Sequence, residues 1–173
     1  MNIRGAVLEE HSKRQSDIIT AYIGNRQKRF DELMELVYTN EEPIARRAAW
    51  TMGHCCREHP ELIHPHLETL YQVISSSDTH PTITRNTLLI VQMVKLSPEL
   101  AGKFYNLCYE QVNERGQMAA TRVYAMSILA NICETEPALL EEVELLINQH
   151  FRSGSAGFKS QARHIRRKLE RIR

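Results

Sequence analysis

Four arginines recur at nearly equal intervals along the chain and offer a chemistry for binding anions. They are Arg47, Arg85, Arg122 and Arg163, and the intervals between them are 38, 37 and 41 residues. A guanidinium group stays charged at neutral pH and pairs with carboxylates or phosphates through parallel hydrogen bonds. If successive repeats place these side chains on one side, the row forms a site for an acidic peptide or a phosphate. The alternative is that each arginine bonds a group in the adjoining turn and ties neighbouring repeats together.

A second candidate surface surrounds the only tryptophan of the chain. Arg46, Trp50, His54 and Arg57 are three or four residues apart, so they lie on one stripe of a helix. Tryptophan and arginine are favoured anchors in protein interfaces. The alternative is that Trp50 packs between repeats, with arginine side chains lying over its ring. The residues that we predict to form the binding surface are Arg46, Arg47, Trp50, His54, Arg57, Arg85, Arg122, Arg163 and Arg166.

The charge of the chain is distributed unevenly, although its net value is only +1. Residues 152–173 carry eight Lys or Arg and one Glu, whereas residues 30–151 have a net charge of −9. Ile165, Leu169 and Ile172 give the basic segment an apolar side. Such a helix suits contact with nucleic acid phosphates or with an anionic membrane surface. The alternative is a solvated capping helix that complements the acidic middle of the chain.

No set of residues has the spacing of a catalytic or metal site. Cys55 and His59 are four residues apart, a spacing that suits zinc, but the neighbouring Cys56 points in another direction. The four cysteines, which include Cys108 and Cys133, lack the spacing of a secreted disulfide framework. We therefore predict reduced thiols in a cytoplasmic protein, no metal, no cofactor and no catalysis. No apolar run approaches the roughly 20 residues that cross a bilayer, so we expect no transmembrane segment.

Apolar residues follow a helical period throughout, and a second landmark repeats beside the arginines. Pro60, Pro98 and Pro137 each open a segment, at intervals of 38 and 39 residues. A near-constant period of this length is typical of stacked helix pairs. We predict one all-α domain, an α-α superhelix of about four helix pairs, in which residues 1–11 are a frayed start. The predicted parts are an N-terminal segment and cap at 1–25 and helix pairs at 26–58, 59–96, 97–134 and 135–173.

The stretch from Pro43 to Gly53 resembles the second helix of a HEAT repeat. In that helix a proline, a Val-Arg pair, two small residues and a Leu-Gly ending are typical. From Ser12 onward the chain also resembles a group of small bacterial HEAT-like proteins. The shared stretches are Tyr22-Ile23-Gly24-Asn25, Lys28-Arg29-Phe30-Asp31-Glu32-Leu33, Arg47-Ala48-Ala49-Trp50, His59-Pro60-Glu61-Leu62, Arg85-Asn86-Thr87 and Gly154-Ser155-Ala156-Gly157-Phe158-Lys159-Ser160.

The resemblance implies a superhelix whose second helices line the concave side, where the predicted binding residues would face a groove. We expect a monomeric scaffold that binds a protein or peptide partner there. The alternative is a nucleic-acid-binding protein similar to HEAT-like DNA glycosylases, using this groove and residues 159–173. Its catalytic acid would have to be Glu58 or Glu134, both at helix ends. A remoter alternative is a lyase, because some members carry an adenylosuccinate lyase label, but the resemblance carries over no catalytic residue.

Overall fold

The computed structural model describes residues 1–39, 41–114 and 116–173. Within these residues the chain forms ten α-helices and two 3₁₀-helices and contains no strand, which confirms the all-α prediction. No helix in the described part is long and apolar enough to cross a membrane. The chain divides into two compact units, Met1–Val94 and Lys95–Arg173, and each is described by itself.

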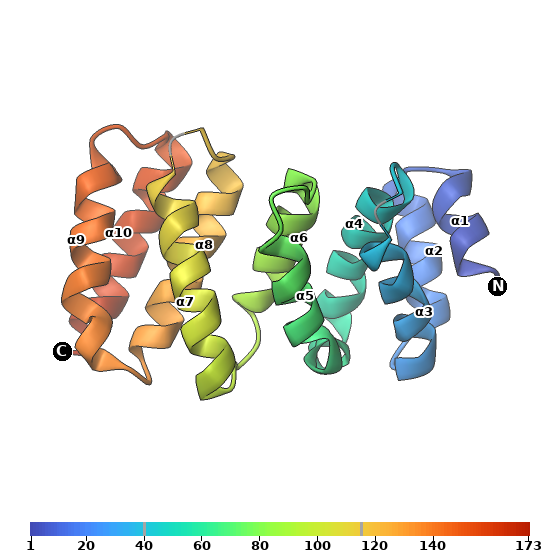
Figure 1. The fold of residues 1–173 in the computed structure, drawn as a ribbon, viewed down its shortest axis with the longest axis horizontal. Coiled ribbons are helices and arrows are strands. Elements are labelled where there is room, and N and C mark those ends of the chain that lie inside the picture. The colour runs from blue at the N-terminus through green and yellow to red at the C-terminus, as the bar shows by residue number, and fades with distance from the viewer. Residues whose placement is uncertain (40, 115) are drawn as a thin grey trace. The chain divides into compact units, whose positions relative to one another are not determined.

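The first unit is organised around α4, which packs against α1, α2, α3, η1 and α6. Ile44, Ala48, Ala49 and Met52 are buried on α4. The helices of this unit pack side by side from α1 to α6 (Figure 1). Their bounds are α1 Ile3–Glu9, α2 Lys13–Ile23, α3 Gln27–Tyr38, α4 Ile44–Glu58, η1 Pro60–His66, α5 Leu67–Ile74 and α6 Pro81–Val91.

The prediction of a frayed start at residues 1–11 is wrong. The side chain of Asn2 caps α1 by accepting a hydrogen bond from the backbone N–H of Gly5, at 3.1 Å. Ile3, Ala6 and Val7 are buried in the unit. Because α1 makes only two turns, it contains too few apolar residues to show a helical period in the sequence.

The second unit contains two helix pairs, α7 with α8 and α9 with α10, and α8 packs against both α7 and α10. Serines open two of these helices: Ser97 accepts a hydrogen bond from the N–H of Leu100, and Ser155 from that of Phe158. Such caps satisfy backbone donors that the first helical turn leaves free. The bounds are α7 Pro98–Asn113, α8 Ala119–Cys133, η2 Pro137–Leu139, α9 Leu140–Phe151 and α10 Ala156–Glu170.

A close approach fixes Gly154 in the turn before α10. A Cβ atom at this position would lie 2.5 Å from Cδ1 of Phe158 and 3.1 Å from the carbonyl oxygen of His150. The ring of Phe158 is itself fully buried, so it has little room to move. The turn residues Gly154 and Ser155 therefore act in packing and capping.

Side-chain hydrogen bonds join the corresponding helices of successive repeats. The bonded residues are about one repeat apart in the sequence. In the first unit Ser16 on α2 bonds Thr51 on α4, 35 residues away. In the second unit Gln161 on α10 bonds Ser127 on α8, 34 residues away, and His150 on α9 bonds Asn113 on α7, 37 residues away. These bonds link corresponding helices of neighbouring repeats within each unit.

Candidate functional site

The outward side of α4 carries the predicted stripe around Trp50. Trp50 and His54 are partly exposed and Arg57 is exposed, whereas the opposite side of the helix is buried. The ring of His54 meets the ring of Trp50 edge-on, with 5.1 Å between centroids. His11, from the segment between α1 and α2, meets Trp50 from another side at 4.7 Å. We call His11, Arg46, Trp50, His54 and Arg57 the Trp50 surface.

The charges of the Trp50 surface are only loosely paired. Arg46 lies 3.7 Å from the carboxylate of Glu42, and both side chains are more than two-fifths exposed, so this pair is weak. His54 lies 3.6 Å from Asp17. Burial, then the charge of Arg57, lowers the pKa of His54, and the opposing effect of Asp17 is smaller.

Burial, then the charges of Arg47 and Arg46, also lowers the pKa of His11. Both histidines are therefore neutral at pH 7. Neutral imidazoles pack against the Trp50 ring without adding charge to it. The surface is a neutral aromatic patch bordered by the guanidinium groups of Arg46 and Arg57.

Two arginines of the periodic row make contacts inside their units. Nη1 of Arg47 donates to the carbonyl oxygen of Leu8 at 2.9 Å and ties α4 to the end of α1. Nε of Arg122 donates to the carbonyl oxygen of Val112 at 3.0 Å, and its guanidinium lies 4.6 Å from the centre of the Phe158 ring. Burial lowers the pKa of Arg122. These two side chains act as ties between neighbouring helices.

The other predicted arginines keep more freedom. Arg85 is partly exposed and makes no hydrogen bond or ion pair with the described residues. Arg163 is exposed and lies 5.8 Å from the ring of Phe151. Arg166 lies closer to the same ring, at 4.3 Å, and bonds Asn148. The row thus contains two kinds of side chain, those tied to a backbone carbonyl and those that remain open.

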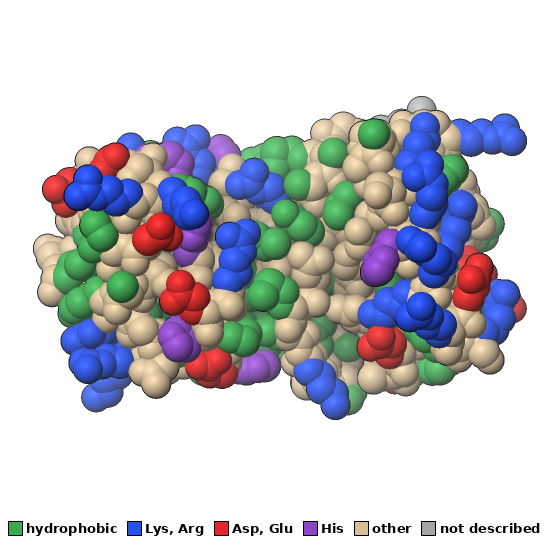
Figure 2. Space-filling model, turned by 180° about the vertical axis from the view of Figure 1, so that it is seen from behind, with side chains coloured by type: hydrophobic (Ala, Val, Ile, Leu, Met, Phe, Trp, Pro, Cys, Tyr) green, Lys and Arg blue, Asp and Glu red, His purple; other side chains and the backbone are tan. Residues whose placement is uncertain are grey.

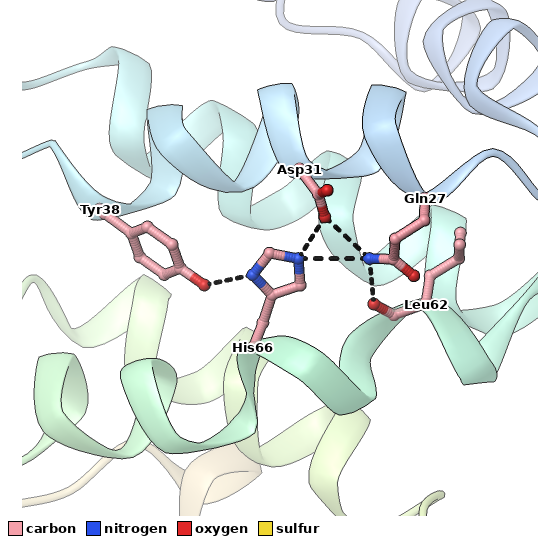
Figure 3. A network of polar contacts seen from close by, with 5 residues as sticks. All are labelled: Gln27, Asp31, Tyr38, Leu62 and His66. Atoms are coloured by element: carbon pink, nitrogen blue, oxygen red, sulfur yellow. Dashed lines mark hydrogen bonds and ion pairs between the residues drawn. The ribbon is translucent and has the colours of Figure 1, made fainter.

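Sequence reasoning missed a polar cluster centred on His66 (Figure 3). Nε2 of His66 lies 2.8 Å from Oδ1 of Asp31, and Nδ1 lies 2.8 Å from the hydroxyl of Tyr38. The amide nitrogen of Gln27 donates to Asp31 at 2.8 Å and to the carbonyl oxygen of Leu62 at 3.0 Å. We call this cluster the His66 clasp, because it joins α3 to η1 of the next repeat.

The proton positions in the His66 clasp follow from its partners. A carboxylate only accepts, so Nε2 of His66 carries a hydrogen and donates to Asp31. In the neutral ring Nδ1 then accepts from the hydroxyl of Tyr38. The contact of 3.4 Å between the Gln27 amide nitrogen and Nε2 joins two donors and is not a hydrogen bond. Both ring nitrogens of His66 are thus hydrogen-bonded.

The chemistry of the His66 clasp is that of a tie between helices. Burial, then the charges of Glu35 and Asp31, raises the pKa of Tyr38, so its hydroxyl stays protonated and is no nucleophile. Burial acts to raise the pKa of Asp31, but hydrogen bonds from Gln27 and His66 outweigh it and the pKa is lowered. The ionised carboxylate thus holds the imidazole in place.

The cysteines contribute packing. All four are buried and free, and burial raises the pKa of Cys55 and of Cys133 to about 11 each. Cys55 contacts the hydroxyl of Thr20 at 3.5 Å, whereas His59 lies beside Glu61. Over residues 1–39, 41–114 and 116–173, no group of three or more His, Cys, Asp or Glu side chains is arranged to hold a metal ion.

The basic C-terminal segment forms α10 and its cap. Phe158, Ala162, Ile165 and Leu169 are buried on one side of the helix. The space-filling view shows Lys and Arg side chains gathered over the unit that carries α10 (Figure 2). The amphipathic character expected of this segment is therefore present, with its apolar side packed inside the unit.

Comparison with known proteins places the chain in a family. The HEAT repeat domain family matches residues 3–169, which is nearly the whole chain. A search of curated proteins and a search of solved structures each returned no match. The matched range covers every helix pair described above, and the all-α architecture agrees with the superhelical repeat fold of that family. On these grounds the chain belongs to the HEAT repeat family.

Proposed function

We propose that this HEAT repeat protein is a non-catalytic scaffold that binds a protein or peptide partner through the Trp50 surface. The observation that carries the proposal is the position of Trp50, partly exposed on α4 between His11 and His54. A partly exposed tryptophan keeps part of a large apolar ring in contact with water, and tryptophan is a favoured anchor in protein interfaces. Covering it with a partner removes that area from water, which is a common source of binding energy.

The charges around Trp50 indicate the chemistry of the partner. Arg57 is exposed, and Arg46 has only its weak contact with Glu42. Both guanidinium groups can meet a carboxylate without breaking a buried contact. The expected partner segment therefore carries an apolar or aromatic side chain for Trp50 and an acidic residue beside it.

Nucleic acid binding by the periodic arginine row receives less support. Arg47 and Arg122 donate to backbone carbonyls inside their units, so they are not free to neutralise phosphates. Protein binding by the Trp50 surface requires neither Arg47 nor Arg122.

A photo-crosslinking experiment in the source cells tests the proposal. A benzophenone amino acid replaces Arg57, and a matched control carries it at Lys28, an exposed position on α3. We expect a discrete protein adduct from position 57, none from position 28, and loss of the adduct when Trp50→Ala is added. Equal adducts from both positions, or an adduct that survives Trp50→Ala, would overturn the proposal.

A further inference from the structure

The outward side of α10 and its cap carries charge that the described structure leaves unpaired. Arg163, Arg167 and Arg171 are four residues apart and therefore lie on one side of the helix. All three are exposed, and their guanidinium groups make no hydrogen bond or ion pair with the residues that the structure describes. We call these three residues the α10 ridge.

Two other cations of the same segment are paired with acids. Lys168 lies 2.9 Å from the carboxylate of Glu134, and Arg173 lies 2.8 Å from that of Glu144. These side chains lie on the flanks of α10, where they meet α8 and α9. The ridge arginines therefore differ from Lys168 and Arg173, whose charges are neutralised by acids of the same unit.

A pocket of about 540 Å³ lies beside the ridge. Three of its six lining residues are Lys or Arg, and the one acid, Glu134, is already paired with Lys168. An acidic side chain entering this pocket would meet several cations at once. The lining residues are Glu134, His164, Arg167, Lys168, Arg171 and Ile172.

We propose that the α10 ridge binds an acidic helix of a partner protein, with one carboxylate seated in the adjoining pocket. Residues four apart on a helix are about 6 Å apart along its axis, so the ridge spans about 12 Å. Carboxylates spaced four residues apart on a partner helix match this interval, and arginine holds a carboxylate through paired hydrogen bonds. The site goes beyond the proposed function, because it lies in the other unit and does not need the Trp50 surface.

The chemistry of the ridge favours an acidic protein segment over nucleic acid. Three cations neutralise few phosphates, and nucleic acid affinity rises with their number. The guanidinium of Arg166 lies 4.3 Å from the centre of the Phe151 ring and competes with a nucleic acid base for stacking on it.

Fluorescence anisotropy with the full chain tests this site. The first probe is a labelled alanine-based helical peptide with three glutamates four residues apart. The second has the same composition with its glutamates spread around the helix. Labelled single-stranded and duplex DNA oligonucleotides are the other probes. The ridge variant combines Arg163→Gln, Arg167→Gln and Arg171→Gln, and the control combines Lys28→Gln, Lys95→Gln and Arg152→Gln, which are exposed positions with the same change of charge.

We expect the ridge variant to weaken binding of the aligned peptide about tenfold and the control to weaken it less than about twofold. Tighter, ridge-dependent binding of DNA would overturn the proposal in favour of a nucleic acid surface. Equal losses in the two variants, or equal binding of the two peptides, would mean non-specific attraction and would also overturn it. So would absence of binding by the unmodified chain. Circular dichroism establishes that both variants are folded, and Trp50→Ala, which tests the other surface, should leave peptide binding unchanged.

Discussion

The His66 clasp in the first unit and the α10 ridge in the second use polar groups in opposite ways. In the clasp His66 is only 13% exposed, and its two ring nitrogens are bonded to Asp31 and Tyr38. In the ridge three guanidinium groups are exposed and unpaired within the described structure. A polar group buried between repeats must be bonded, because an unmatched one costs about 1–3 kcal/mol. An exposed one is hydrated and remains available to a partner. Whether a polar side chain stabilises the fold or can bind a partner depends on whether it is already bonded, more than on its residue type.

The periodic arginines show the same difference within one residue type. Arg122 bonds a carbonyl and lies over Phe158, whereas Arg163 makes only a distant contact with Phe151. The arginine at this position of the repeat therefore packs inside the unit at Arg122 and remains open to solvent at Arg163. Each expected result below tests this difference.

The largest effect is expected from breaking the clasp. His66→Ala should lower the free energy of unfolding by about 2–3 kcal/mol, because it removes the partner of Asp31 and Tyr38 and leaves space beside Phe30. Urea unfolding followed by circular dichroism measures it. His64→Ala, at an exposed position of the same segment, should change this free energy by less than about 0.5 kcal/mol. Equal effects of the two substitutions would show that the clasp contributes nothing to stability.

The next largest effect is expected at Arg122, which is bonded to a backbone carbonyl. Arg122→Met should lower the free energy of unfolding by about 1–2 kcal/mol, because the bond to Val112 and the contact with Phe158 are lost. Arg163→Met, the matched change at an open position, should stay within about 0.5 kcal/mol of the unmodified chain. A loss at Arg163 as large as that at Arg122 would contradict the division of the row.

The ridge should be almost neutral for stability. Replacing Arg163, Arg167 and Arg171 by glutamine should change the free energy of unfolding by less than about 0.5 kcal/mol, because no described contact is broken. The same urea titration measures it. A large loss would mean that the ridge stabilises the end of α10, as basic residues at a helix C-terminus can do through the helix dipole.

The smallest effect is a dependence of stability on pH near the Trp50 surface. The pKa of His54 is lowered on folding from 6.5, so the unfolded chain binds the proton first. Its contribution to stability is therefore complete above pH 6.5 and is lost as the pH falls below that value. The melting temperature should fall between about pH 7 and pH 5.5, and less so for His54→Gln. Asp31 does not interfere, because its pKa lies below 3.8. Equal pH profiles for the two proteins would exclude His54 as the cause.

Sequence patterns predicted the all-α HEAT-like repeat fold, because prolines and apolar spacing are local signals that repeat. They also predicted the outward stripe of Trp50, since α4 buries its other sides. The His66 clasp was not predictable in this way. Gln27, Asp31 and His66 lie at polar positions that look solvated, and they meet only because of the rotation of α3 relative to η1. The contacts of Arg122 and Arg163 were likewise not predictable. They depend on where Val112, Phe151 and Phe158 lie in the fold, and the repeat period alone does not give those positions.

The fluorescence of Trp50, the only tryptophan, tests the central claim most directly. Emission and acrylamide quenching are measured for the free chain and after addition of the protein captured by crosslinking at position 57. We predict that acrylamide quenches Trp50 in the free chain and that the partner shifts its emission to shorter wavelength and protects it in proportion to binding. A partner that binds without changing emission or quenching, or a change produced instead by DNA, would contradict the assignment of the Trp50 surface as a protein-binding site.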